Sequence, residues 1–115
     1  MNFNELELLK VKEETTGWFK RSARKAVSRA IKLLRPRLEQ AIRLPEPQRQ
    51  MALNKLIGEA SAARYRATES GATPYRHPKW AAAAVCENWL QGVASGNGKK
   101  IARIERVVYD LENRG

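Results

Sequence analysis

Residues Trp80 to Ala94 read WAAAAVCENWLQGVA, and the helix that this stretch predicts is apolar on most of its sides. Such a helix is typical of the centre of a hydrophobic core, because it has no broad polar face to turn toward water. Pro78 precedes the stretch and suits the first turn of a helix. The turn residues 95–98, SGNG, end it. The stretch therefore predicts a buried helix around which the rest of the chain is arranged.

Further helices are expected on both sides of this central one, at about residues 17–35, 47–68 and 99–112, each with apolar residues at helical spacing. Pro36 disfavours helix at the residue before it, so we expect the first of these to end at Arg35. A short helix would then cover residues 36–43, before the rigid turn Pro45-Glu46-Pro47.

The first sixteen residues are ambiguous between helix and strand, because Leu6, Leu8 and Val11 nearly alternate. We expect a short helix in an acidic segment that could be loosely attached. Alternatively, the segment could fold against the basic residues that follow, or shield them until a partner arrives. No convincing strand is predicted anywhere. The sequence thus predicts an all-α fold, a small bundle of four to five helices in a single domain over residues 1–115.

The helix expected over residues 17–35 is strongly basic. The run KRSARKAVSRAIKLLRPR, residues 20–37, contains no acid. Its eight cations are Lys20, Arg21, Arg24, Lys25, Arg29, Lys32, Arg35 and Arg37. Residues 18–49 carry ten Lys or Arg against two Glu, which supplies +8 of the formal net charge of +10. One segment therefore dominates the electrostatic field, as a binding face would.

The periodicity divides this helix into two faces. An apolar stripe is expected to face the core, with Val27 and Ile31 beside it, and contains Phe19, Ala23, Ala26, Ala30, Leu33 and Leu34. A second stripe is expected to face outward and contains Arg21, Lys25, Arg29 and Lys32. Ordinary surface helices mix charges of both signs, with Glu–Lys pairs one turn apart, and this helix does not.

An acid-free basic face predicts contact with a phosphate backbone. We expect a nucleic acid partner, RNA or DNA, and a non-enzymatic accessory subunit of a ribonucleoprotein complex or a regulator. The alternative is a protein-interaction module, such as a phage- or plasmid-type inhibitor or adaptor, that docks on an acidic protein surface. A membrane-surface helix anchored by Trp18 and Phe19 ranks lower, since an alanine-rich stripe inserts weakly. The plainest alternative is a solvated surface.

A second group of candidates interleaves aromatic and basic side chains. Its cations are Arg64, Arg66, Arg76 and Lys79, which would contact phosphates. Its possible base-stacking residues are Tyr65, Tyr75 and His77. The alternative is that aromatic residues of this region close the core, which we favour for Trp80.

No catalytic or cofactor motif is found, and we expect neither an enzyme nor a cofactor. Gly96-Asn97-Gly98-Lys99-Lys100 lacks the spacing of a phosphate-binding loop. One His and one Cys, nine residues apart, cannot supply the three or four ligands of a zinc site. The lone Cys86 and the absence of an 18-residue apolar run favour a cytoplasmic protein without a transmembrane segment.

Overall fold

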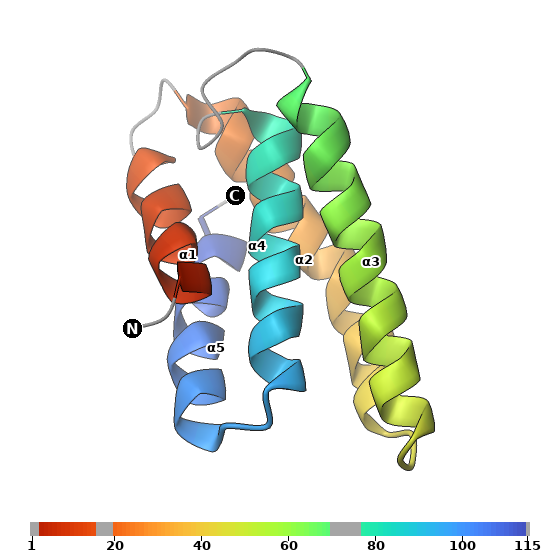
Figure 1. Ribbon diagram of the computed structural model, residues 1–115. Coiled ribbons are helices and arrows are strands. Elements are labelled where there is room, and N and C mark those ends of the chain that lie inside the picture. Colours follow the sequence, from red (N-terminus) through yellow and green to blue (C-terminus); the bar gives the residue numbers. More distant parts are fainter. Residues whose placement is uncertain (1–2, 16–19, 70–76, 115) are drawn as a thin grey trace.

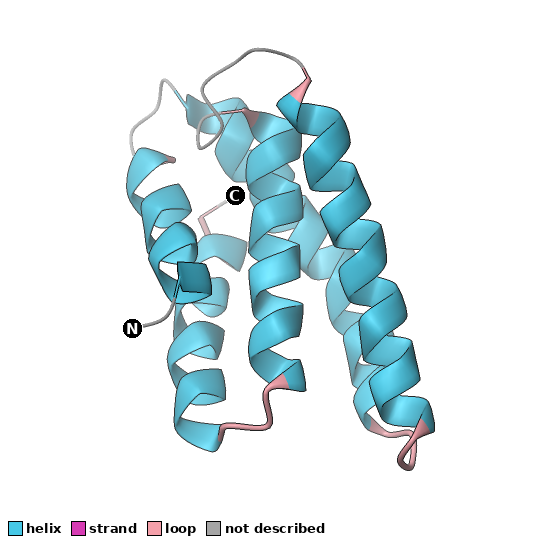
Figure 2. Cartoon of the chain, viewed as in Figure 1, coloured by secondary structure: helices cyan, strands magenta, loops and turns pink. Residues whose placement is uncertain are grey.

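The computed structural model describes residues 3–15, 20–69 and 77–114, and these ranges contain five helices and no strand. In chain order the helices are α1 (Phe3–Glu14), α2 (Arg21–Ile42), α3 (Gln48–Thr68), α4 (Pro78–Ala94) and α5 (Gly98–Glu112), as Figure 1 shows. Short connections link α2 to α3 and α4 to α5 (Figure 2). The expected all-α bundle is confirmed.

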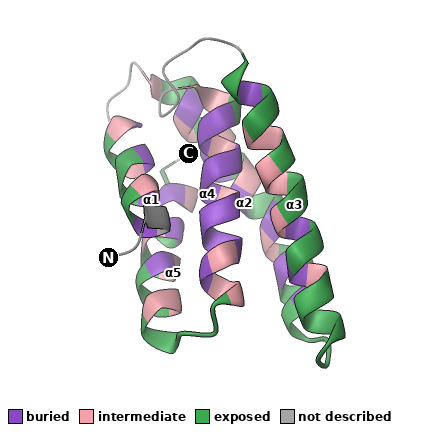
Figure 3. Cartoon of the chain, viewed as in Figure 1, coloured by how far each residue is buried: buried purple, intermediate pink, exposed green. Residues whose placement is uncertain are grey.

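Helix α4 lies at the centre and packs against all four other helices. Its sequence explains this position, since Ala81, Ala84, Val85, Trp89 and Leu90 are each no more than 1% exposed. Figure 3 shows buried residues along nearly the whole of α4, whereas the other helices carry exposed outer faces. The prediction of a buried central helix is confirmed.

Gly92 leaves room for a side chain of α5 where that helix packs on α4. A β-carbon at this position would collide with the Cδ1 atom of Ile104 on α5. The turn between the two helices contains Gly96, whose φ of +71° is a conformation that side chains with a β-carbon rarely adopt. The side chain of Asn97 then accepts a hydrogen bond from the Lys100 amide, which caps α5.

Helix α2 runs unbroken through Pro36, so the predicted end at Arg35 and the separate helix over residues 36–43 are wrong. A proline inside a helix removes one backbone hydrogen bond and costs about 3 kcal/mol. Here Leu34, Leu38 and Ala41 stay buried on the same side of the helix before and after the proline. Their packing offsets the local cost. Residues 17–19, where the helix was expected to start, lie outside the described ranges.

The apolar stripe of α2 is rotated relative to the expectation. The buried apolar residues are Ala23, Val27, Ile31, Leu34, Leu38 and Ala41. Leu33 is 64% exposed, and Ala26 and Ala30 are only partly buried. Leu33 and Leu34 point about 100° apart, and α4 contacts the side of Leu34. Leu33 is left at the edge of the surface that the cations occupy.

The N-terminal segment is helical, and its apolar face is packed. Leu8 and Val11 of α1 are at most 1% exposed, because α1 lies against α4 and α5. Glu5, only 6% exposed, accepts a hydrogen bond of 2.8 Å from Arg103 on α5. This bond lowers the pKa of the Glu5 carboxyl, although burial acts in the opposite direction. Helix α1 therefore places its carboxylate on a cation of α5.

Candidate nucleic-acid interface

Four cations share the outward side of α2: Arg21, Lys25, Arg29 and Lys32, here called the basic face. All four are exposed, and they lie within an arc of about 80° of the helix circumference. Successive members at four-residue spacing are separated by about 6 Å along the axis. Within the described part of the chain none of the four forms an ion pair.

Arg35 belongs to the same basic run but has a different environment. Its Nε donates to Glu112 at 3.1 Å, and its guanidinium lies 3.9 Å from Glu105. The guanidinium also lies over the ring of Trp89, 5.0 Å from the ring centroid. The Trp89 indole N–H donates to Glu105 at 2.9 Å, so a carboxylate links the two side chains. Arg35 therefore joins α2 to α4 and α5.

Three further candidate cations also have carboxylate partners. Lys20 lies 3.5 Å from Glu14, and Arg37 donates to Glu59 of α3 at 3.0 Å. The charges of Lys20 and Arg37 are therefore partly neutralised by other parts of the fold.

The third of these pairs is the most buried. Arg64 of α3 donates to Glu87 of α4 at 2.6 Å, and the two side chains are 23% and 10% exposed. The hydrogen bond to Glu87 raises the pKa of the Arg64 guanidinium, although desolvation opposes it. An arginine in this position joins two helices and has little surface left for a phosphate.

Arg24 belongs neither to the exposed cations of the basic face nor to the cations paired with carboxylates. It is partly buried, and its Nε atom is buried with no hydrogen-bond partner in the described ranges. It lies beside the basic face, about 60° from Arg21 around the helix. Arg24 widens the positive surface without belonging to the exposed row.

The aromatic and basic group does not gather around the basic face. Tyr65 is 65% exposed, and the Arg64 guanidinium lies 5.1 Å from its ring centroid. Arg66, Lys79 and His77 line a cavity instead, and Tyr65 is not part of its lining. Trp80 is 6% exposed, so its expected place in the core is confirmed. The two remaining candidates, Tyr75 and Arg76, lie outside the described residues.

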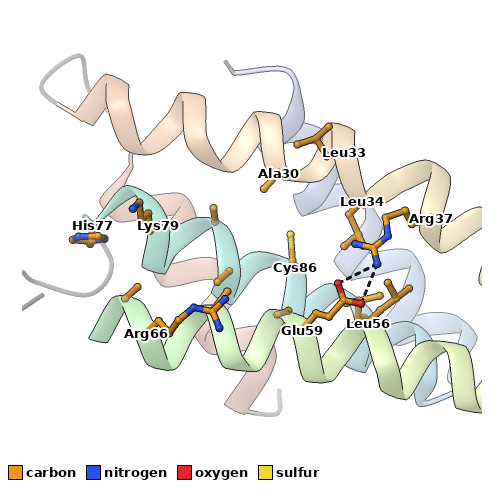
Figure 4. A pocket seen from close by; sticks show the side chains of 16 residues that line it. Ala30, Leu33, Leu34, Arg37, Leu56, Glu59, Arg66, His77, Lys79 and Cys86 are labelled. Atoms are coloured by element: carbon orange, nitrogen blue, oxygen red, sulfur yellow. Dashed lines mark hydrogen bonds and ion pairs between the residues drawn. The ribbon is translucent and has the colours of Figure 1, made fainter. Parts of the chain in front are cut away.

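This cavity was not predicted. It has a volume of about 830 Å³ and lies between α2, α3 and α4 (Figure 4). Helices α2 and α3 both pack extensively on α4 but touch each other much less, which leaves space between them. The alanines of the lining provided a signal in the sequence, since small side chains on facing helices do not fill the space between them: Ala30, Ala60, Ala63, Ala67, Ala82 and Ala83.

The described residues contain no group of three or more His, Cys, Asp or Glu side chains that could hold a metal ion. Cys86 lies in the cavity floor, and burial raises the pKa of its thiol to about 12. A thiol with this pKa stays protonated near neutral pH and is a weak nucleophile. None of the described helices is long and apolar enough to cross a bilayer.

No family model, curated protein or solved structure matches this chain. A functional proposal must therefore rest on the chemistry of the basic face and of the cavity beside it.

Proposed function

We propose that the protein is a non-enzymatic nucleic-acid-binding protein, an accessory subunit or regulator that contacts the phosphate backbone of RNA or DNA through the basic face. One observation carries the proposal: four cations are exposed together on one side of α2, and no carboxylate of the described residues pairs with them. Like charges repel each other, and a polyanion relieves that repulsion while it releases its own counterions.

The dimensions of the basic face suit a phosphate backbone. Arg21 and Lys32 are separated by about 16 Å along the axis, at 1.5 Å per residue. This length is enough for the four cations to contact several phosphates of one strand. The packing of α2 on α4 holds the cations at fixed spacing. Backbone contacts alone carry little sequence information, so we expect weak sequence preference.

The ion pairs narrow the set of candidate contacts. Arg35, Arg37 and Arg64 are each bonded to a carboxylate of another helix, so binding a phosphate would require them to give up that partner. The proposal therefore rests on the basic face, with Arg24 at its edge.

The test is a charge reversal at three of the four positions, Arg21→Glu, Lys25→Glu and Arg29→Glu in one variant. Affinity for a fluorescent oligonucleotide, measured by anisotropy, should fall by at least about tenfold, because each lost phosphate contact weakens binding to all sequences alike. Both single strands and duplexes are measured.

The matched control reverses three exposed cations elsewhere, Lys55→Glu, Lys99→Glu and Arg106→Glu, with the same change in net charge. Its affinity should fall much less than that of the first variant. Equal losses in the two variants would mean that net charge, and not the basic face, governs binding, and would contradict the proposal.

Docking on an acidic protein surface is the second candidate, and Leu33 favours it. This side chain is 64% exposed at the edge of the basic face, and an apolar residue beside cations suits a protein partner better than a phosphate backbone. The absorbance ratio at 260 and 280 nm, measured before and after a high-salt wash of the purified protein, separates the two candidates. Co-purified nucleic acid supports the first, whereas a stoichiometric protein without nucleic acid supports the second.

A further inference from the structure

We propose that the cavity between α2, α3 and α4 binds a single-chain amphiphile with a carboxylate head, of the class of a long-chain fatty acid. This inference does not rest on nucleic-acid binding, because the residues that line the cavity are not those of the basic face. Two features of the cavity favour such a ligand: its apolar walls and the different charges at its two ends.

The walls suit an acyl chain. The floor is formed by α4 through Ala82, Ala83, Cys86 and Leu90, and the sides carry mainly alanine and leucine from α2 and α3. The volume of about 830 Å³ falls within the range of about 300–1,000 Å³ that is typical of small-molecule sites. Such sites combine apolar walls with a few polar groups that fix the orientation of the ligand.

The polar groups lie at the ends of the cavity and differ in net charge. At one end are Arg66, Lys79 and His77; at the other are Arg37 and Glu59, which bond to each other (Figure 4). Within the described residues neither Arg66 nor Lys79 has an ion-pair partner, so the first end carries two unneutralised cations. An anionic head is therefore favoured at this end, and an uncharged tail along the rest.

His77 adds a donor to the cationic end. Its Nδ1 atom accepts the Trp80 backbone N–H at 3.4 Å, which caps α4. In the neutral imidazole the proton then resides on Nε2, which has no partner among the described residues and can donate to an anion.

The length of the cavity suits a single acyl chain. Arg37 of α2 and Glu59 of α3 bridge the two side walls at the far end, at 3.0 Å. Both side chains of this pair are about half exposed, so the pair marks the end of the apolar walls without closing the cavity. The apolar end of an acyl chain would lie against Leu34 and Leu56. The cavity extends over about 16 Å between Leu56 and Ala67 on α3.

The first experiment compares three ligands with the same alkyl chain, each below its micelle concentration or solubility limit: dodecanoate, dodecanol and dodecyltrimethylammonium. Calorimetry should show one dodecanoate per chain, and amide NMR shifts should centre on Ala63 and Ala82. Dodecanol should bind about tenfold more weakly, because it cannot form charge-assisted hydrogen bonds with the cationic end. The ammonium compound should not bind.

Paired variants locate the site. Ala63→Trp fills the cavity and should abolish dodecanoate binding, whereas Ala62→Trp, on the exposed side of α3, should not. The double variant Arg66→Gln and Lys79→Gln should weaken dodecanoate binding by about tenfold and leave dodecanol binding unchanged. The double variant should fold even if Ala63→Trp does not, since the side chains of Arg66 and Lys79 are both exposed.

Equal affinity for dodecanoate and dodecanol, or undiminished dodecanoate binding after loss of both Arg66 and Lys79, would overturn the proposal. Binding of an acidic amphipathic peptide in the absence of any dodecanoate binding would also overturn it. That result would make the cavity a protein-docking site. Oligonucleotide affinity is measured on the same variants. It should be unchanged by Ala63→Trp, so failure of one proposal is distinguishable from failure of the other.

Discussion

Arg35 and Lys32 lie three residues apart on α2, and they have different surroundings. Lys32 belongs to the basic face, exposed and without a carboxylate partner in the described ranges. Arg35 is partly buried between Glu105 and Glu112 and stacks on Trp89. The same run of sequence thus supplies one cation for packing and another for the surface.

The difference shows that acids elsewhere in the chain decide what each cation can do. Four carboxylates of α3, α4 and α5 pair with Arg35, Arg37 and Arg64, and none of the four pairs with a cation of the basic face. They are Glu59, Glu87, Glu105 and Glu112. A count of charges along the sequence cannot make this distinction. Three predictions test this distinction between paired and unpaired cations, in order of decreasing expected effect on stability.

The largest effect is expected from Glu87→Ala. The variant leaves the Arg64 guanidinium partly buried without its main partner, and breaking a buried pair in this way costs about 3 kcal/mol of unfolding free energy. Urea denaturation measures the loss. Glu87→Gln retains an acceptor oxygen and should cost less, while the exposed Glu39→Gln should be close to neutral. A neutral Glu87→Ala would show that the pair is not structural.

The comparison within α2 is tested by Arg35→Gln and Lys32→Gln, two identical changes in net charge. Arg35→Gln removes a charge-assisted hydrogen bond and the contact with Trp89, and should cost about 2 kcal/mol. Lys32→Gln should alter stability by less than about 0.5 kcal/mol, since the side chain is exposed. Similar losses of stability from the two substitutions would refute the division into structural and free cations.

A smaller, pH-dependent effect is expected from Glu5→Gln. Because the folded-state pKa of Glu5 lies below the ordinary value of 4.5, its carboxylate stabilises the fold above that value. This contribution is lost as pH falls through the lowered folded-state pKa. The variant should be less stable than the wild type at neutral pH, by about 1 kcal/mol. The difference should shrink in acid, and a constant difference across pH would argue against the Glu5–Arg103 bond.

Much of the fold could be predicted from the sequence, because helical periodicity and turn residues act locally. The apolar stretch of α4 identified the centre of the core, and Arg21, Lys25 and Arg29 are exposed as their spacing predicted. The expected end of the helix at Arg35 is wrong because the penalty of Pro36 is only local. Packing on both sides of the proline outweighs that penalty.

The candidate site was less accessible from sequence. Arg35 and Glu112 are 77 residues apart, and Arg64 and Glu87 are 23 apart, so these pairs arise only when the helices assemble. The cavity depends on how far α2 and α3 separate across α4, which no local pattern encodes. Alanine at facing positions such as Ala63 and Ala83 was the only local sign of it.

The salt dependence of nucleic-acid affinity is the most direct test of the basic face. Four phosphate contacts predict a slope of log K against log salt of about −2.8 on single strands and about −3.6 on duplexes. Replacing all four cations of the basic face with Gln should bring the slope close to zero, whereas Arg35→Gln should leave it unchanged. A wild-type slope near zero, or a slope that survives loss of all four cations, would contradict the account.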